Sequence, residues 1–185
     1  MKRIFLTLVL TFALFTAIKA QGKYFTKTGK ISFFSKASLE DIEAKNGAVT
    51  AVLDTRTGAL QFAVLMKGFE FKKALMQEHF NENYVESSKY PKADFKGVVV
   101  NNSEVSYSKP GTYPTKIKGK LTMHGITKDV ETTGLISVEP TQLKATSTFN
   151  VQLSDYGIKL PALVKDKVSN TIKIIVDTKL EPLKK

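Results

Sequence analysis

The chain has no cysteine and no tryptophan, and it has only two histidines among its 185 residues. Without a thiol it has no cysteine nucleophile, no thiolate metal ligand and no disulfide. No serine lies in a glycine-flanked nucleophile motif, and the sequence has no glycine-rich phosphate-binding loop. These absences remove the commonest catalytic arrangements, so we expect no enzymatic activity, no catalytic residues and no cofactor.

The two histidines do not indicate a catalytic or metal site. His79 follows Glu78 directly, and Glu82 lies one turn further along the same expected helix. Two or three ligands on one exposed helix face hold a divalent cation poorly, so we interpret them as solvated side chains and expect no metal site. His124 stands beside Gly125 in an expected two-residue turn, a position that histidine tolerates better than most residues.

Arginine is scarce although the chain is basic. Lysine and arginine number 28 against 17 acidic residues, a net charge of +11 at pH 7, yet Arg56 is the one arginine after residue 20. A nucleic-acid reader is expected to cluster arginine or to show a recognition helix or aromatic motif, so we expect no nucleic-acid partner. The scattered lysines favour a solubilising surface, with transient contact to an anionic membrane surface as a further expectation.

Long apolar runs are also absent, with one exception at the N-terminus. Ile4–Ile18 is a fifteen-residue run without charge, preceded by two basic residues and followed by Ala20. This layout is typical of a secretory signal peptide over residues 1–20, cleaved near Ala20. A membrane-spanning helix needs about 20 apolar residues, so an uncleaved anchor is the less favoured alternative. We expect a periplasmic or secreted protein with one domain over residues 21–185.

The dominant pattern in the remaining chain is alternation of apolar and polar residues with a period of two. Such alternation is typical of strands with one buried face, whereas a helix repeats its apolar residues every three or four positions. Eight segments are expected strands: 30–35, 48–54, 60–66, 93–100, 116–123, 129–138, 143–153 and 168–180.

One segment breaks this pattern. Residues 70–84 are rich in helix formers and carry Leu75, Met76, Phe80 and Tyr84 on a broad apolar side. We therefore predict an all-β fold, an eight-stranded antiparallel lipocalin-like barrel with one amphipathic helix inserted after the third strand, because closure removes exposed edges. A two-sheet sandwich has the same alternation and stays open at this point.

The expected inward faces combine large and small side chains. The large ones are Phe33, Phe62, Met66, Phe95, Met123 and Phe149. The small ones, expected to leave gaps, are Ala93, Gly97, Gly119, Gly134, Ala145 and Ser147. Phenylalanine and methionine adapt to a flexible chain, but they also fill cores. The residues alone therefore leave a ligand cavity and a filled core about equally open.

Several stretches resemble the YceI-like family of exported lipid-binding proteins. They are Gly29–Phe33, His79–Gly97, Gly119–Gly134, Leu153–Ile158 and Asp166–Asp177. The resemblance implies a lipocalin-like barrel that encloses a polyisoprenoid or a fatty-acid-like chain. It implies a lipid-binding wall and mouth formed by Phe33, Phe62, Met66, Leu75, Met76, Phe80, Phe95, Ile117, Leu121, Met123 and Phe149. Leu75, Met76 and Phe80 are then expected near the opening.

Three functions follow as hypotheses. The first is a carrier, monomeric or homodimeric, that binds an isoprenoid or acyl-chain lipid. The second is a barrel with a filled core that serves as an envelope stress or protein-interaction module without a small-molecule ligand. The third is an enzyme acting on lipids, which would need a polar constellation around His79 at the barrel mouth.

Overall fold

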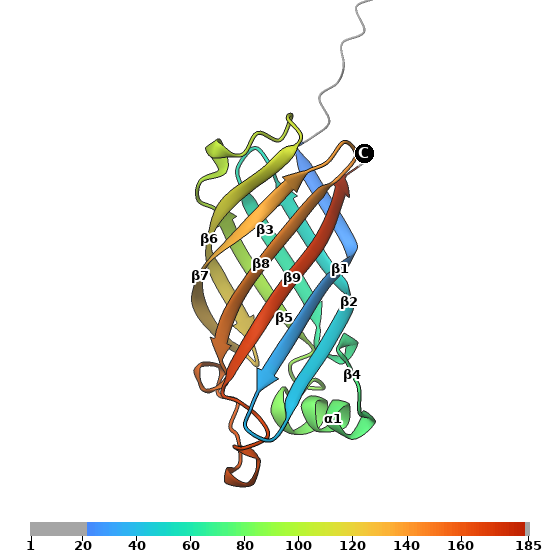
Figure 1. Cartoon of the computed structure of the whole chain (residues 1–185), viewed down its shortest axis with the longest axis vertical. Helices are drawn as coiled ribbons and strands as arrows, with labels where there is room; N and C mark the ends of the chain where they lie inside the picture. The colour runs from blue at the N-terminus through green and yellow to red at the C-terminus, as the bar shows by residue number, and fades with distance from the viewer. Residues whose placement is uncertain (1–21, 184–185) are drawn as a thin grey trace, which may run out of the picture.

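The computed structural model describes residues 22–183. Figure 1 shows a barrel of tilted strands with a short helix at one end. The predicted signal peptide, residues 1–20, and its cleavage site lie outside the described residues. No helix within residues 22–183 is both long enough and apolar enough to cross a membrane.

Nine strands within the described residues form one sheet, and eight of them build the barrel wall. The wall strands are β1 Lys23–Lys36, β2 Asp41–Asp54, β3 Ala59–Leu65, β5 Lys92–Val99, β6 Gly111–Met123, β7 Ile126–Val138, β8 Leu143–Gln152 and β9 Thr171–Pro182. All pairings are antiparallel, and β1 pairs with both β2 and β9, which closes the ring. The predicted eight-stranded antiparallel barrel is therefore confirmed, and the sandwich alternative is wrong.

The strand register brings the inward residues of neighbouring strands side by side. Phe62 of β3 is paired with Phe95 of β5, which is paired in turn with Leu121 of β6. On the opposite wall, Phe33 of β1 is paired with Ile174 of β9. Since side chains alternate between the two faces of a strand, this register directs these rows into the barrel interior.

The single helix predicted over residues 70–84 is wrong in its extent. The chain first forms β4, Glu70–Phe71, which pairs with Ala44 and Lys45 of β2. The α-helix α1 spans only Ala74–His79, and the five-residue π-helical segment η2 continues it over Phe80–Tyr84. The backbone bonds between β4 and β2 override the local helical pattern, which residues 70–71 shared. The position of the helix after the third wall strand, β3, is as predicted.

Strand bounds differ mainly at the ends. β1 begins at Lys23 and β2 at Asp41, because these two strands pair with each other over nearly their full length, including stretches without clear alternation. β3 ends at Leu65, where the 3-10 turn η1, Met66–Gly68, begins. Pairing with a neighbouring strand therefore extends a strand beyond the segment in which apolar and polar residues alternate.

The connections at the two barrel ends differ in size. One end, called the helix end below, carries residues 37–40, 66–91, 124–125 and 153–170, which include α1 and the 3-10 turns η4, Leu153–Tyr156, and η5, Ala162–Val164. The far end carries the connections 55–58, 100–110 and 139–142, which include the 3-10 turn η3, Asn102–Glu104. The helix end therefore has most of the irregular chain, and Figure 1 shows α1 lying across it.

Candidate functional site

The barrel encloses a cavity of about 310 Å³. It reaches from Leu60 and Ile136 in the far half of the barrel to Met76 and Lys167 at the helix end. The side chains that line it are mainly aliphatic and aromatic. Because the exposed residues His79 and Lys167 belong to the lining, the cavity reaches solvent at the helix end. Its volume lies at the lower end of the range of small-molecule sites.

The structure brings ten of the eleven predicted lipid-binding residues together in this lining. They are Phe33, Phe62, Met66, Met76, Phe80, Phe95, Ile117, Leu121, Met123 and Phe149. Leu75 is the exception, because its side chain is 61% exposed and does not line the cavity. α1 turns Met76 inward, so the preceding residue faces outward.

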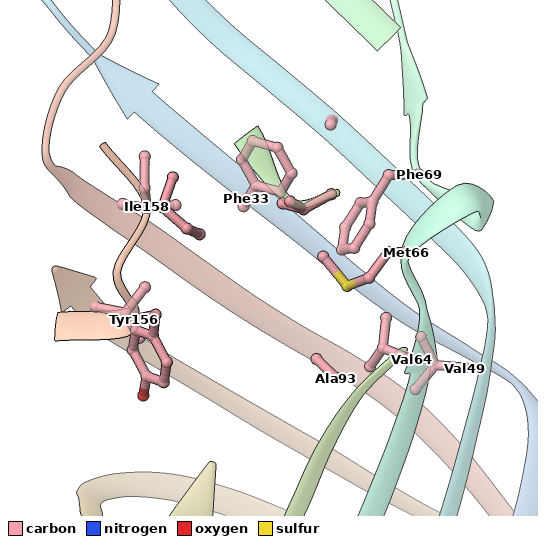
Figure 2. Packing of buried hydrophobic residues seen from close by; sticks show 12 residues of the cluster. Phe33, Val49, Val64, Met66, Phe69, Ala93, Tyr156 and Ile158 are labelled. Carbon is pink, nitrogen blue, oxygen red and sulfur yellow. The ribbon is translucent and has the colours of Figure 1, made fainter. Parts of the chain in front are cut away.

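Four phenylalanines form an aromatic cluster where the helix end meets the cavity. The ring of Phe80 stacks on Phe33 at 5.5 Å between centroids, and it lies 5.0 Å from Phe71 and 5.7 Å from Phe69. Figure 2 shows Phe33, Phe69 and Met66 close together. The cluster attaches η2 to β1 and β4, since aromatic pairs at such distances are favourable beyond the area they bury.

Phe69 and Phe71 line the cavity although the sequence did not indicate them as site residues. The stretch Phe69-Glu70-Phe71 alternates with a period of two, which was the available signal for a short strand. The predicted helix over residues 70–84 includes Phe71, so this alternation was not interpreted as a strand. Ile31 and Leu53 also line the cavity, and so does Tyr84, which the sequence placed on the apolar side of the expected helix but not among the site residues.

Small inward residues leave less space than the sequence suggested. A Cβ atom added to Gly97 would lie 2.6 Å from Cζ of Phe95, and one added to the paired Gly119 would also lie 2.6 Å from that atom. The Phe95 ring therefore covers this glycine pair, and the expected gap there is wrong. Ala145 and Ser147, by contrast, line the cavity.

Polar groups are few in the lining and lie at separate places. At the helix end, Glu40 accepts a hydrogen bond from Nζ of Lys73 at 2.7 Å. Deeper in the barrel, the Ser147 hydroxyl donates to the carbonyl of Thr133 at 2.7 Å, and the buried Thr115 hydroxyl has no partner among the described residues. In residues 22–183 no lining hydroxyl is hydrogen-bonded to a histidine or a carboxylate.

His79 stands exposed at the cavity opening, and no carboxylate pairs with it among the described residues. Residues 22–183 contain no group of three His, Asp or Glu side chains placed to hold a metal ion. The arrangement can enclose an apolar molecule, and the charged residues of its lining, Glu40 and Lys167, lie at the helix end.

His124 joins the two long connections of the helix end. Its Nδ1 lies 2.9 Å from the carbonyl oxygen of Tyr156, and its Nε2 lies 2.8 Å from Oε2 of Glu86. The ring also packs on Tyr90 at 4.6 Å between centroids. His124 and Gly125 both have positive φ, so the predicted two-residue turn is confirmed. The sequence predicted the place of His124 in this turn, but it did not indicate the contacts of its ring across the helix end.

Comparisons with solved structures place the fold among known barrels. A polyisoprenoid binding domain from Saccharophagus degradans, implicated in plant cell wall breakdown, superposes with a TM-score of 0.75 at 13% identity, over 88% of this chain and 99% of that one. BcnA of Burkholderia cenocepacia gives 0.67 at 14% identity, over 82% and 95% of the chains. The YceI protein of Campylobacter jejuni gives 0.59 at 14% identity, over 76% and 85%.

A comparison with curated proteins gave no significant match. At the identities of the solved structures, their likeness establishes the fold alone. The sequence match to a protein family is broader, because the model of the YceI-like domain matches residues 10–180. The chain therefore belongs to the YceI-like family.

Proposed function

We propose that this protein is an exported carrier that encloses a long apolar chain, a polyisoprenoid or a fatty-acid-like molecule, in its barrel. The observation that carries the proposal is the apolar cavity that opens at the helix end. A filled core would have favoured the rival hypothesis of an interaction module without a ligand, and the lumen is not filled. The fold shared with the polyisoprenoid binding domain from Saccharophagus degradans supports a lipid ligand.

The driving force for binding is the transfer of the ligand chain out of water. Each buried methylene contributes about 0.8 kcal/mol, so roughly ten methylenes would contribute about 8 kcal/mol before the costs of ordering and association. Flexible Met66, Met76 and Met123 in the lining adapt to chains of different shape. Binding of this kind requires no chemical step, and we propose that the protein is not an enzyme.

Export is part of the proposal and is supported by the charged start, apolar run and Ala20 of residues 1–20. After cleavage, the carrier would act in the periplasm or outside the cell as a monomer or homodimer. Its role would be to keep one apolar chain away from water between the place of loading and the place of release.

The test is extraction of the purified mature protein with organic solvent, followed by mass spectrometry of the extract. We expect one class of prenyl or acyl compound to co-purify, or to be taken up when added to delipidated protein. Ala145 lines the cavity, so Ala145→Phe should place a ring in it and lower the amount of bound lipid several-fold. Gln61→Phe is the matched control, because Gln61 lies on the exposed outer side of β3.

The outcome that contradicts the proposal is an empty protein that also takes up neither prenyl nor acyl chains. Equal lipid content in Ala145→Phe and Gln61→Phe would place any bound lipid outside the barrel and would also contradict it.

A further inference from the structure

The most exposed large apolar side chains gather at the helix end. Among the large apolar side chains of residues 22–183, those of Leu163, Leu39 and Leu75 are the three most exposed, at 92%, 71% and 61%. Leu163 belongs to η5, Leu39 to the turn between β1 and β2, and Leu75 to α1. Exposure of three leucines at one end of a barrel is costly in water and marks an interaction surface.

Direct contacts join the three segments that carry these leucines. The backbone N–H of Leu39 donates to the carbonyl of Asp166 at 2.9 Å, which ties the β1–β2 turn to the β8–β9 connection. On its other side, Glu40 pairs with Lys73 just before α1 at 2.7 Å. The three leucines therefore belong to one surface, named the leucine rim here.

The leucine rim surrounds the opening of the cavity. Each of its three segments supplies a lining residue: Glu40 from the turn, Met76 from α1 and Val164 from η5. The exposed leucines thus lie immediately beside residues that face the lumen. An apolar chain that leaves the cavity would pass this surface before it met water.

Lysines flank the most exposed part of the rim. The apolar tip Leu160–Val164 stands between Lys159 on one side and Lys165, Asp166 and Lys167 on the other. All four charged residues are exposed, and the three lysines outnumber the one carboxylate. No carboxylate of residues 22–183 forms an ion pair with any of the three. Figure 1 shows this connection extending beyond the end of the barrel. An apolar tip with lysines on both sides matches the chemistry of an anionic lipid surface, where apolar groups insert and lysines contact head groups.

We propose that the helix end docks on the surface of an anionic lipid bilayer, with Leu39, Leu75 and Leu163 inserted and the flanking lysines on the head groups. This inference rests on the proposed carrier function, because docking directs the cavity opening toward the membrane. The ligand then moves between bilayer and barrel without crossing water.

The test is co-sedimentation of the mature protein with vesicles of phosphatidylglycerol and phosphatidylcholine, compared with vesicles of phosphatidylcholine alone. We expect binding to the anionic vesicles that weakens as salt rises, because salt screens the lysines. Leu163→Glu should lower the partition coefficient about tenfold, because it removes an inserting side chain and adds a negative charge. Leu39→Glu and Leu75→Glu should act in the same direction.

Val100→Glu is the matched control. Val100 is 51% exposed but lies at the far end of the barrel, so this variant should bind vesicles like the unchanged protein. Equal losses in Leu163→Glu and Val100→Glu would overturn docking through the leucine rim. Absence of binding to anionic vesicles would overturn it as well. A further contradicting outcome is a protein that does not bind vesicles but forms a concentration-dependent dimer, which Leu163→Glu dissociates. This outcome would assign the leucine rim to a second copy of the chain and would refute docking on a membrane.

The same variants separate this inference from the proposed function. Because Leu163 does not line the cavity, Leu163→Glu should retain its co-purified lipid. Retained lipid without vesicle binding by the unchanged protein would refute docking alone. Vesicle binding by a protein that never takes up lipid into its cavity would refute the carrier function and would still support docking on the bilayer.

Discussion

His124 and Glu86 are hydrogen-bonding neighbours, 2.8 Å apart from Nε2 to Oε2, and both have left-handed backbone conformations, with φ of 51° and 46°. They are the two non-glycine residues of positive φ among residues 22–183. Such conformations cost energy and persist only where the surroundings hold them. The contact therefore links two strained points, the β6–β7 turn and the segment after η2, into one clamp across the helix end.

Replacement of His124 by asparagine should separate the turn from the clamp. Asparagine tolerates a positive φ, so the turn remains, but its shorter side chain cannot reach both Glu86 and Tyr156. We expect His124→Asn to lower the free energy of unfolding by about 1–3 kcal/mol, measured by urea denaturation. His79→Asn, at an exposed position, should change it by less than about 0.5 kcal/mol. Equal stability of the two variants would contradict the clamp.

Phe80 should decide whether α1 stays attached to the barrel. Phe80→Ala removes the ring that packs on Phe33, Phe69 and Phe71. We expect faster amide hydrogen exchange over residues 74–84 while the wall strands keep their protection, and a loss of about 2 kcal/mol in stability because Phe80 is only half-buried. Leu75→Ala, which removes an exposed side chain, should alter neither quantity. Unchanged exchange in Phe80→Ala would show that other contacts hold α1.

Gly97 and Gly47 give a matched pair of glycine replacements in strands. A Cβ atom on Gly97 would lie 2.5 Å from the carbonyl oxygen of Lys118 and 2.6 Å from Cζ of Phe95, whereas nothing lies within 4 Å of one on Gly47. We expect Gly97→Ala to cost about 1–3 kcal/mol through overpacking. Gly47→Ala should be neutral or stabilise by about 0.5 kcal/mol, because it restricts the unfolded chain. The midpoint of denaturation measures both, and a stable Gly97→Ala would contradict the close packing of Phe95.

The burial of Tyr107 leads us to expect a lower free energy of unfolding at alkaline pH. Burial raises the pKa of Tyr107 from 10.0 to about 12, and its hydroxyl donates to Oδ1 of Asn102 at 2.7 Å. Because the folded state keeps this proton to higher pH than the unfolded chain, the resulting stabilisation is present below pH 10 and disappears as pH rises toward about 12.

Tyr107→Phe provides the comparison. Burial also raises the pKa of Tyr156, so the unchanged protein alone does not isolate the contribution of Tyr107. The difference in unfolding free energy between Tyr107→Phe and the unchanged protein should be constant below pH 10 and change in favour of the variant above it. A difference that stays constant to pH 12 would show that Tyr107 ionises alike in both states.

Local patterns were sufficient for the wall of the barrel. Alternation along residues 143–153 and 168–180 identified strands now paired from Leu143 with Leu180 to Gln152 with Thr171. The same parity directed Phe33 and Phe149 inward, because successive side chains of a strand point to opposite faces. The His124-Gly125 turn also followed from its two residues, since their conformations depend on the backbone at that place.

Tertiary contacts decided what local patterns could not. Phe71 left the expected helix because strand β2 offered its backbone hydrogen-bond partners. Leu75 faces outward because α1 turns its neighbour Met76 toward the cavity. The Phe95 ring covered a glycine pair that had suggested empty space.

The sequence by itself determined the eight wall strands, their inward faces and the apolar character of the interior, because each depends on residues near one another along the chain. Whether that interior is open or filled was decided only by the tertiary structure. A cavity is the small volume left when side chains from all eight wall strands have packed, and no single strand contains that information.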